Sequence, residues 1–75
     1  VPKDVAMGLP ILTITGTNDL CVENYRGMTE YTDQIIRLQS KSGQIKITGK
    51  KLEVIYYTND EIKIHGHIRT IEYQL

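Results

Sequence analysis

IKITGKKLEV, at residues 45–54, is the stretch that decides the fold. Apolar and polar residues alternate on both sides of Gly49, which is the pattern of a half-buried strand before and after that glycine. A glycine also supplies the positive φ that a two-residue type II′ turn needs at its first position. We therefore predict a hairpin that turns at Gly49 and Lys50. Its opposed pairs are expected to be Ile47 with Leu52, Ile45 with Val54, and Lys46 with Glu53.

The same pattern recurs along the chain. It appears as LTITG at 12–16 and IKIHG at 62–66, and in degraded form as TEYTDQIIRL at 29–38, where Asp33 takes the place of the glycine. The sequence therefore predicts four strand-turn-strand units of about seventeen residues each. Turn-rich links are expected between them at NYRG (24–27), SKSG (40–43) and YTND (57–60).

Two of these copies allow more detailed predictions. In the first copy, a loop from residue 15 to residue 19 places Ile14 opposite Leu20. In the last copy, the alternation changes parity after Gly66, so we expect a β-bulge near Arg69 or Thr70.

The predicted fold class is all-β, in a single domain spanning residues 1–75. About seven to eight short strands form an antiparallel meander, closed as a sandwich or an open barrel. A β-solenoid is the structural alternative, but units of unequal turn length fit it less well. A chain of this size buries only about 60% of the surface that its unfolded form exposes, so a homo-oligomer would strengthen a thin core.

Composition restricts the function classes. The chain has 9 basic and 9 acidic residues, and its single cysteine, Cys21, lies within an apolar strand pattern. This favours a packed thiol in a reducing compartment over a nucleophile. No run approaches the roughly 18 apolar residues of a membrane span, and the start has no charged-then-apolar leader. We expect a soluble, cytoplasmic protein that does not insert into a membrane.

Catalytic and metal-binding motifs are not specified by this sequence. His65 and His67 stand two apart, a spacing that can place two imidazoles on one face of a strand, but a turn at Gly66 would separate them. Neither a nucleophile with its base nor a phosphate-binding glycine loop followed by a helix is evident. We predict no enzyme activity, no cofactor and no metal site.

A basic block without acidic residues runs through the middle of the chain. It is the best argument for a polyanion partner, because small β-barrels bind single-stranded nucleic acid through a basic groove with exposed aromatic rings. A solvated basic face explains the same residues, and we consider nucleic acid the less favoured partner. The block consists of Arg37, Lys41, Lys46, Lys50 and Lys51.

The alternation also suggests a surface for a protein partner. It assigns Tyr56 to the core side, with Leu52 and Val54, and places Ile55 and Tyr57 together on the outer face. An outward apolar and aromatic pair of this kind is typical of a protein interface as well as of a platform for bases.

ENYRGMTEYT, at 23–32, is the most individual stretch, because it breaks the alternation and concentrates polar and aromatic groups around one glycine. Structurally, Arg26 is expected to pair with a neighbouring carboxylate, and Asn24 to close an Asx turn. Functionally, the stretch is a candidate partner surface. Its candidate residues are Glu23, Asn24, Tyr25, Arg26, Glu30 and Tyr31.

These residues resemble a known family. VPKDV, GLPILTITG, ENYRGMTEYT, GQIKITGKKLEV and EIKIHGHIRTIEY together are similar to the YabP/YqfC family of sporulation proteins, most of all to its YqfC branch. The resemblance covers nearly the whole chain. At Tyr25 the family pattern leads us to expect histidine, so a role for an ionisable ring there does not carry over.

The resemblance implies a role in spore formation, in the mother cell of an endospore-forming bacterium of the Firmicutes. It also implies a protein partner, namely a membrane-associated sporulation protein, which would hold the chain at a membrane without inserting it. The combined hypothesis is a non-catalytic assembly or adaptor module that docks a partner, or a second copy, through ENYRGMTEYT or through Ile55 and Tyr57.

Overall fold

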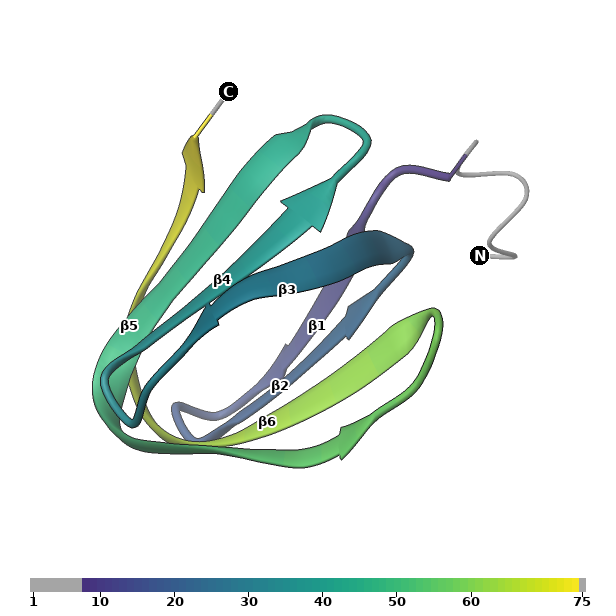
Figure 1. Cartoon of the computed structure of the whole chain (residues 1–75). Coiled ribbons are helices and arrows are strands. Elements are labelled where there is room, and N and C mark those ends of the chain that lie inside the picture. The colour runs from purple at the N-terminus through teal and green to yellow at the C-terminus, as the bar shows by residue number, and fades with distance from the viewer. Residues whose placement is uncertain (1–7, 75) are drawn as a thin grey trace.

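The computed structural model describes residues 8–74, all of whose regular elements are β-strands (Figure 1). The VPKDV stretch, which contributes to the resemblance, lies outside these residues. Within residues 8–74 there is no helix with the length and apolarity needed to cross a membrane. The strands are β1 (Ile11–Thr15), β2 (Asp19–Glu23), β3 (Tyr25–Tyr31), β4 (Ile35–Ser40), β5 (Gly43–Tyr57) and β6 (Glu61–Gln74).

The six strands form one antiparallel sheet in the order β1-β2-β6-β5-β4-β3. This confirms the all-β antiparallel class. The first hairpin has the predicted register, with Ile14 opposite Leu20 and Leu12 opposite Val22. The degraded copy also forms a hairpin, in which Thr32 Oγ1 accepts a hydrogen bond of 2.9 Å from the backbone N–H of Ile35.

The predicted hairpin at Gly49 is wrong. β5 runs without interruption through this glycine, and its partner is β6 rather than its own second half. Ile47 therefore lies opposite Ile71, and Lys46 opposite Glu72 rather than Glu53. The same holds for the last copy, where β6 continues through Gly66. Residues 8–74 thus form six strands, two of them long, in place of seven or eight short ones.

Gly49 and Gly66 are the corners of these two long strands. A Cβ on Gly49 would lie 2.1 Å from the carbonyl oxygen of His67, and one on Gly66 would lie 2.5 Å from that of Lys51. Only glycine permits backbones to approach this closely. The predicted bulge is confirmed: Thr48 lies opposite Thr70 and Gly49 opposite Ile68, which leaves Arg69 without a partner. Bulges bend a strand and increase its twist.

The bend places the two ends of the β5–β6 pair in different halves of the molecule. Residues 61–65 of β6 pair with β2, whereas residues 43–48 of β5 pair with β4. The sheet thus folds over, with β3 and β4 on one side and β1 and β2 on the other (Figure 1). Between them lies the core, formed by Leu20, Val22, Tyr25, Ile36, Leu38, Ile45, Ile47, Leu52, Ile62 and Ile64.

Candidate functional site

Tyr25 closes one side of the folded sheet, where β3 meets the second half of β5. Its ring is buried and stacks on Tyr57, with ring centroids 5.5 Å apart and planes inclined by 16°. Its hydroxyl donates to the backbone carbonyl oxygens of Thr58 and, at 3.1 Å, Glu61. Burial raises the pKa of Tyr25 to about 12. The ring thus acts as a neutral donor that ties β3 to the β5–β6 turn.

Further hydrogen bonds extend this closed seam along β5. The backbone N–H of Val54 donates to the hydroxyl of Tyr31 at 3.0 Å, and that of Leu52 to the carbonyl of Asp33 at 2.8 Å. Asn24, whose φ is 66°, donates from its side chain to the carbonyl of Leu9 at 3.1 Å, rather than closing an Asx turn. ENYRGMTEYT therefore contributes mainly to closure of the fold.

The ion pair expected for Arg26 is not formed among residues 8–74. Arg26 is exposed, and Glu30 pairs instead with Arg37, whose Nε lies 2.6 Å from Glu30 Oε1. Glu23 belongs to a different group of side chains, described below with Cys21. The predicted polar surface therefore does not present its residues as one patch.

Ile55 and Tyr57 are both exposed, by 52% and 48%, but they do not share the outer face that the alternation predicted. A register shift leaves Ile55 unpaired, because Val54 lies opposite Ile64 and Tyr56 opposite Lys63. Tyr57 then lies opposite the buried Ile62, on the side of the core, where it stacks on Tyr25. The hidden bulge reverses the parity on which the prediction depended. Tyr56 is the residue on the outer side, and its hydroxyl donates to Glu61 at 2.7 Å.

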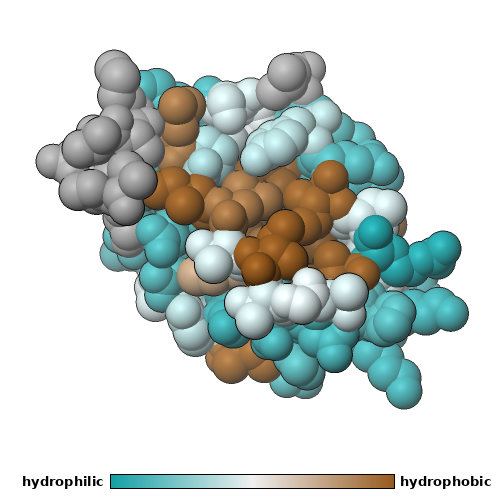
Figure 2. All heavy atoms as spheres, turned by 180° about the vertical axis from the view of Figure 1, so that it is seen from behind, coloured by the Kyte–Doolittle hydropathy of each residue, from teal (hydrophilic) through white to brown (hydrophobic). Residues whose placement is uncertain are grey.

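The opposite side of the folded sheet is open. β1 is an edge strand, and β6 has no partner on its outer side beyond His65. The turn between β1 and β2 is tied to β6 by two backbone hydrogen bonds of 3.0 Å, from Gly66 N–H to the carbonyl of Asn18 and from Ile68 N–H to that of Thr17. Figure 2 shows apolar side chains gathered on this face.

We call this surface the apolar opening. Two of its side chains, Ile14 on β1 and Tyr73 on β6, are each 55% exposed although they lie opposite the buried Leu20 and Ile45. Behind them the partly buried Leu12, Ile68 and Ile71 reach the core. The sequence prediction missed this surface because it depends on which two strands remain unpaired across the fold, which no local pattern specifies.

The structure divides the predicted basic block between two places. Arg37 lies on the outer face of β4, where it also donates to Gln44 at 3.3 Å and Gln74 at 2.9 Å. Lys46 lies beside it, opposite Glu72. Lys41 belongs to the β4–β5 turn. A carboxylate and two amides thus contact Arg37, and Lys46 lies opposite an acidic residue.

Lys50 and Lys51 lie apart from these, at the corner of β5 and β6. Together with His67 and Arg69 they line a hollow of about 470 Å³, and we call these four residues the basic corner. Lys50 lies directly opposite His67. The sequence prediction missed His67 and Arg69, because only the pairing of β6 with β5 brings them to the lysines.

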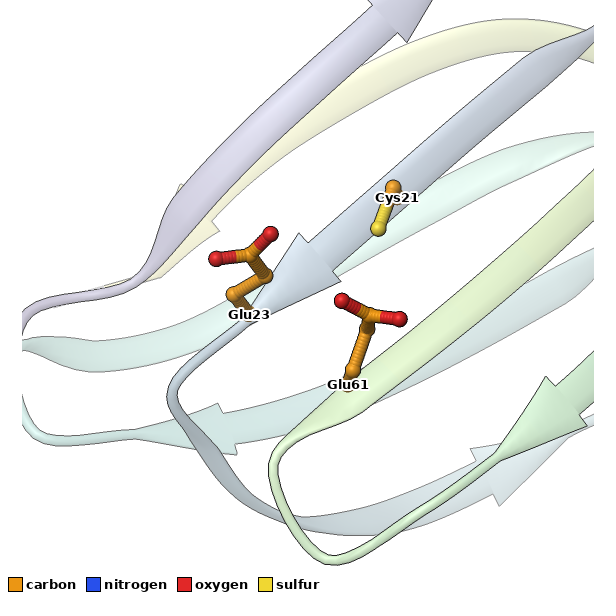
Figure 3. Close-up of side chains that lie close together, drawn as sticks. All are labelled: Cys21, Glu23 and Glu61. Atoms are coloured by element: carbon orange, nitrogen blue, oxygen red, sulfur yellow. The ribbon is translucent and has the colours of Figure 1, made fainter. Parts of the chain in front are cut away.

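Cys21, Glu23 and Glu61 form a third group, on neighbouring positions of β2 and β6 (Figure 3). Their ligand-type atoms lie within 4.8 Å of one another, and all three side chains are half-buried. Burial first, and the charge of Glu61 second, raise the pKa of the Cys21 thiol. A protonated thiol is a poor nucleophile and a poor metal ligand.

The two histidines have separate surroundings. His65 Nδ1 lies 3.0 Å from Asp19 Oδ1, and this hydrogen bond lowers the pKa of Asp19. His67 belongs to the basic corner on the other side of Gly66. Instead of the predicted turn, Gly66 is a bend within β6, with a φ of 146°.

Comparison with known proteins agrees with this description. The model of the YabP family matches residues 9–75. A Bacillus subtilis (strain 168) protein described as the uncharacterized protein YqfC is 34% identical over 73 residues, which cover 97% of this chain and 78% of the relative. No solved structure gives a significant match. On both grounds, the chain belongs to the YabP/YqfC family.

Proposed function

We propose that this chain is a non-catalytic assembly or adaptor module of spore formation, and that it binds a protein partner at the apolar opening. Its family is one associated with sporulation. The raised pKa of Cys21, the one thiol of the chain, argues against nucleophilic catalysis by that residue. The proposed setting is the mother cell, with a membrane-associated sporulation protein as the partner.

The observation that carries this proposal is the difference between the two sides of the folded sheet. Tyr25, Tyr31 and the backbone of Asp33 close one side with hydrogen bonds. The other side leaves the edges of β1 and of the second half of β6 unpaired, with Ile14 and Tyr73 exposed there; exposed side chains on the closed side, such as Ile55, lie beside a hydrogen-bonded seam instead. Exposed apolar patches next to unpaired edges mark interaction sites.

The partner segment is expected to be an extended strand. β1 reads ILTIT, so it carries no charge and three of its five residues are apolar. Natural edge strands are usually protected from pairing by charged residues or proline. An uncharged edge beside an apolar surface suits strand addition, in which main-chain hydrogen bonds give affinity and alternate side chains fill the apolar surface.

Polar substitutions in the apolar opening are expected to abolish function without unfolding the protein. A double variant, Ile14→Ser with Tyr73→Ser, changes two side chains that are each 55% exposed, so folding is retained while apolar contacts with the partner are lost. The measurement is the yield of heat-resistant spores, which should fall to that of a strain lacking the gene.

Ile55→Ser is the matched control, because Ile55 is 52% exposed but lies on β5, at the closed seam. It should leave the spore yield unchanged. A normal yield from the double variant, with a loss from Ile55→Ser, would return the partner surface to Ile55. If the double variant only converts a dimer into a monomer in sedimentation experiments, the occupant is a second copy and the adaptor proposal is wrong.

We do not extend the proposal to nucleic acid. Binding of a single strand requires a continuous basic track with stacking rings. Arg37 is held by Glu30 and by amide groups, and Lys46 lies opposite Glu72. The division of the basic block between two places therefore weighs against a continuous basic track for a single strand.

A further inference from the structure

The basic corner gathers four basic side chains around one hollow, with no carboxylate among the residues that line it. Lys50, Lys51, His67 and Arg69 are all exposed. Within residues 8–74 none of them forms a side-chain hydrogen bond or an ion pair. Arg37, by contrast, contacts a carboxylate and two amides. The fold thus pairs Arg37 with a carboxylate, while the four side chains of the basic corner remain exposed.

The backbone irregularities of the corner are what bring these side chains together. Consecutive residues of a regular strand point to opposite faces. At Lys51 the φ is 55°, and the register with β6 shifts between Lys50 and Glu53, so both lysines line the same hollow. On the facing strand, the bulge at Arg69 follows directly on the corner. Strained backbone of this kind is often found at functional sites.

The charge of the hollow selects the class of ligand. Two lysines and one arginine are permanently cationic near neutral pH, and no acidic residue is among the lining side chains. Arginine presents a planar set of donors that matches the oxygens of phosphate, and lysine adds a mobile point charge. A hollow of about 470 Å³ has room for one phosphate-sized anionic group.

We propose that the basic corner binds a single phosphate-bearing anion, either a soluble phosphate or the phosphate of an anionic lipid headgroup. This inference is independent of the partner proposed for the apolar opening. It concerns a different surface, so either one can fail while the other stands.

The first test is a titration of the ¹⁵N-labelled protein with inorganic phosphate and with glycerol 3-phosphate, at constant ionic strength, followed by ¹H–¹⁵N correlation spectra. Saturable shifts should be confined to the amides of the corner, near Lys50 and Arg69. Shifts that do not saturate, or that are equally large around Lys46, would overturn the proposal.

Variants give the second test. Lys50→Gln with Arg69→Gln removes two exposed charges, and should weaken phosphate binding by about tenfold or more, since each charge-assisted hydrogen bond to an ion contributes substantially. Lys46→Gln is the matched control, because this lysine lies on the same strand but opposite Glu72. Dispersed spectra of all variants establish that they are folded. Wild-type affinity in the double variant would contradict the proposal.

Binding assays with vesicles and with an oligonucleotide distinguish the possible sources of the bound phosphate, which are a lipid headgroup, a soluble ligand and a nucleic acid. Binding to phosphatidylglycerol vesicles but not to phosphatidylcholine vesicles, lost in the Lys50→Gln and Arg69→Gln variant, would assign the site to a lipid headgroup. Binding of the two soluble phosphates without vesicle binding would assign it to a soluble ligand. Binding only to oligothymidylate, growing with its length, would replace the proposal by nucleic-acid recognition.

Discussion

Gly49→Ala is expected to prevent folding. The added Cβ would lie 2.1 Å from the carbonyl oxygen of His67, and that atom belongs to the backbone of the paired strand, which cannot turn aside. The loss should exceed about 4 kcal/mol, the range reached by severe backbone strain. A chain of 75 residues has a total stability of about 4–11 kcal/mol. Gly66→Ala should behave in the same way, because its Cβ would meet the carbonyl oxygen of Lys51 at 2.5 Å.

Two other glycines provide controls for this prediction. Gly27→Ala should change stability by less than about 1 kcal/mol, since its Cβ would meet nothing within 4 Å. Gly16→Ala has equal space but a φ of 60°, so it should cost about 1–2 kcal/mol. The measurement is urea denaturation followed by circular dichroism. A cooperative transition of Gly49→Ala at the wild-type midpoint would mean that the strands do not cross here as described.

Tyr25→Ala is expected to cost about 3–5 kcal/mol, the usual loss when a buried aromatic ring is removed. The ring is only 5% exposed, and it anchors β3 to the β5–β6 turn. Tyr25→Phe keeps the ring but removes the donor to the carbonyls of Thr58 and Glu61. It should cost about 1–3 kcal/mol, because two carbonyl groups lose their donor in a partly buried place.

A variant of the neighbouring Arg26, compared with the Tyr25 variants, distinguishes a structural role of ENYRGMTEYT from a role in docking a partner. Arg26 is exposed, so Arg26→Ala should change stability by no more than about 0.5 kcal/mol. Chemical denaturation of the three variants gives these values. If Tyr25→Ala retained wild-type stability but lowered the yield of heat-resistant spores, ENYRGMTEYT would be a partner surface rather than the closed seam.

The first hairpin was predictable because its information is local. Apolar residues alternate in both β1 and β2, and the loop between them is short, so the pairing of Ile14 with Leu20 depends on neighbouring sequence alone. The parity change after Gly66 was equally local, and it correctly predicted the bulge at Arg69.

The hairpin at Gly49 was mispredicted because the same pattern fits two structures. Ile47 and Leu52 are both buried, as either a tight turn or a bent strand requires. What distinguishes the two is the partner of Ile47, which is Ile71, 24 residues further on. A pairing between residues so far apart in the sequence cannot be recognised from the five-residue pattern.

The candidate sites were predicted less well than the fold, because they depend on long-range pairings. Ile55 changes the parity of Tyr57 through a bulge that no proline or glycine marks. Arg69 joins Lys50 only through the corner, and Ile14 and Tyr73 border one opening only because two strand edges remain free. The residue types thus predicted that a charged surface and an apolar surface exist. Which residues form each surface depended on the order of the strands in the sheet.

The most direct test of the central claim, that the apolar opening is the partner surface, is photocrosslinking in sporulating cells. A benzoylphenylalanine at position 14 should give one discrete adduct with another protein, and the adduct should disappear when Tyr73→Ser is added. The same probe at position 55, a site of similar exposure on the closed side, should give no such adduct. An adduct from position 55 alone, or an adduct at position 14 with the mass of two copies of this chain, would contradict the claim.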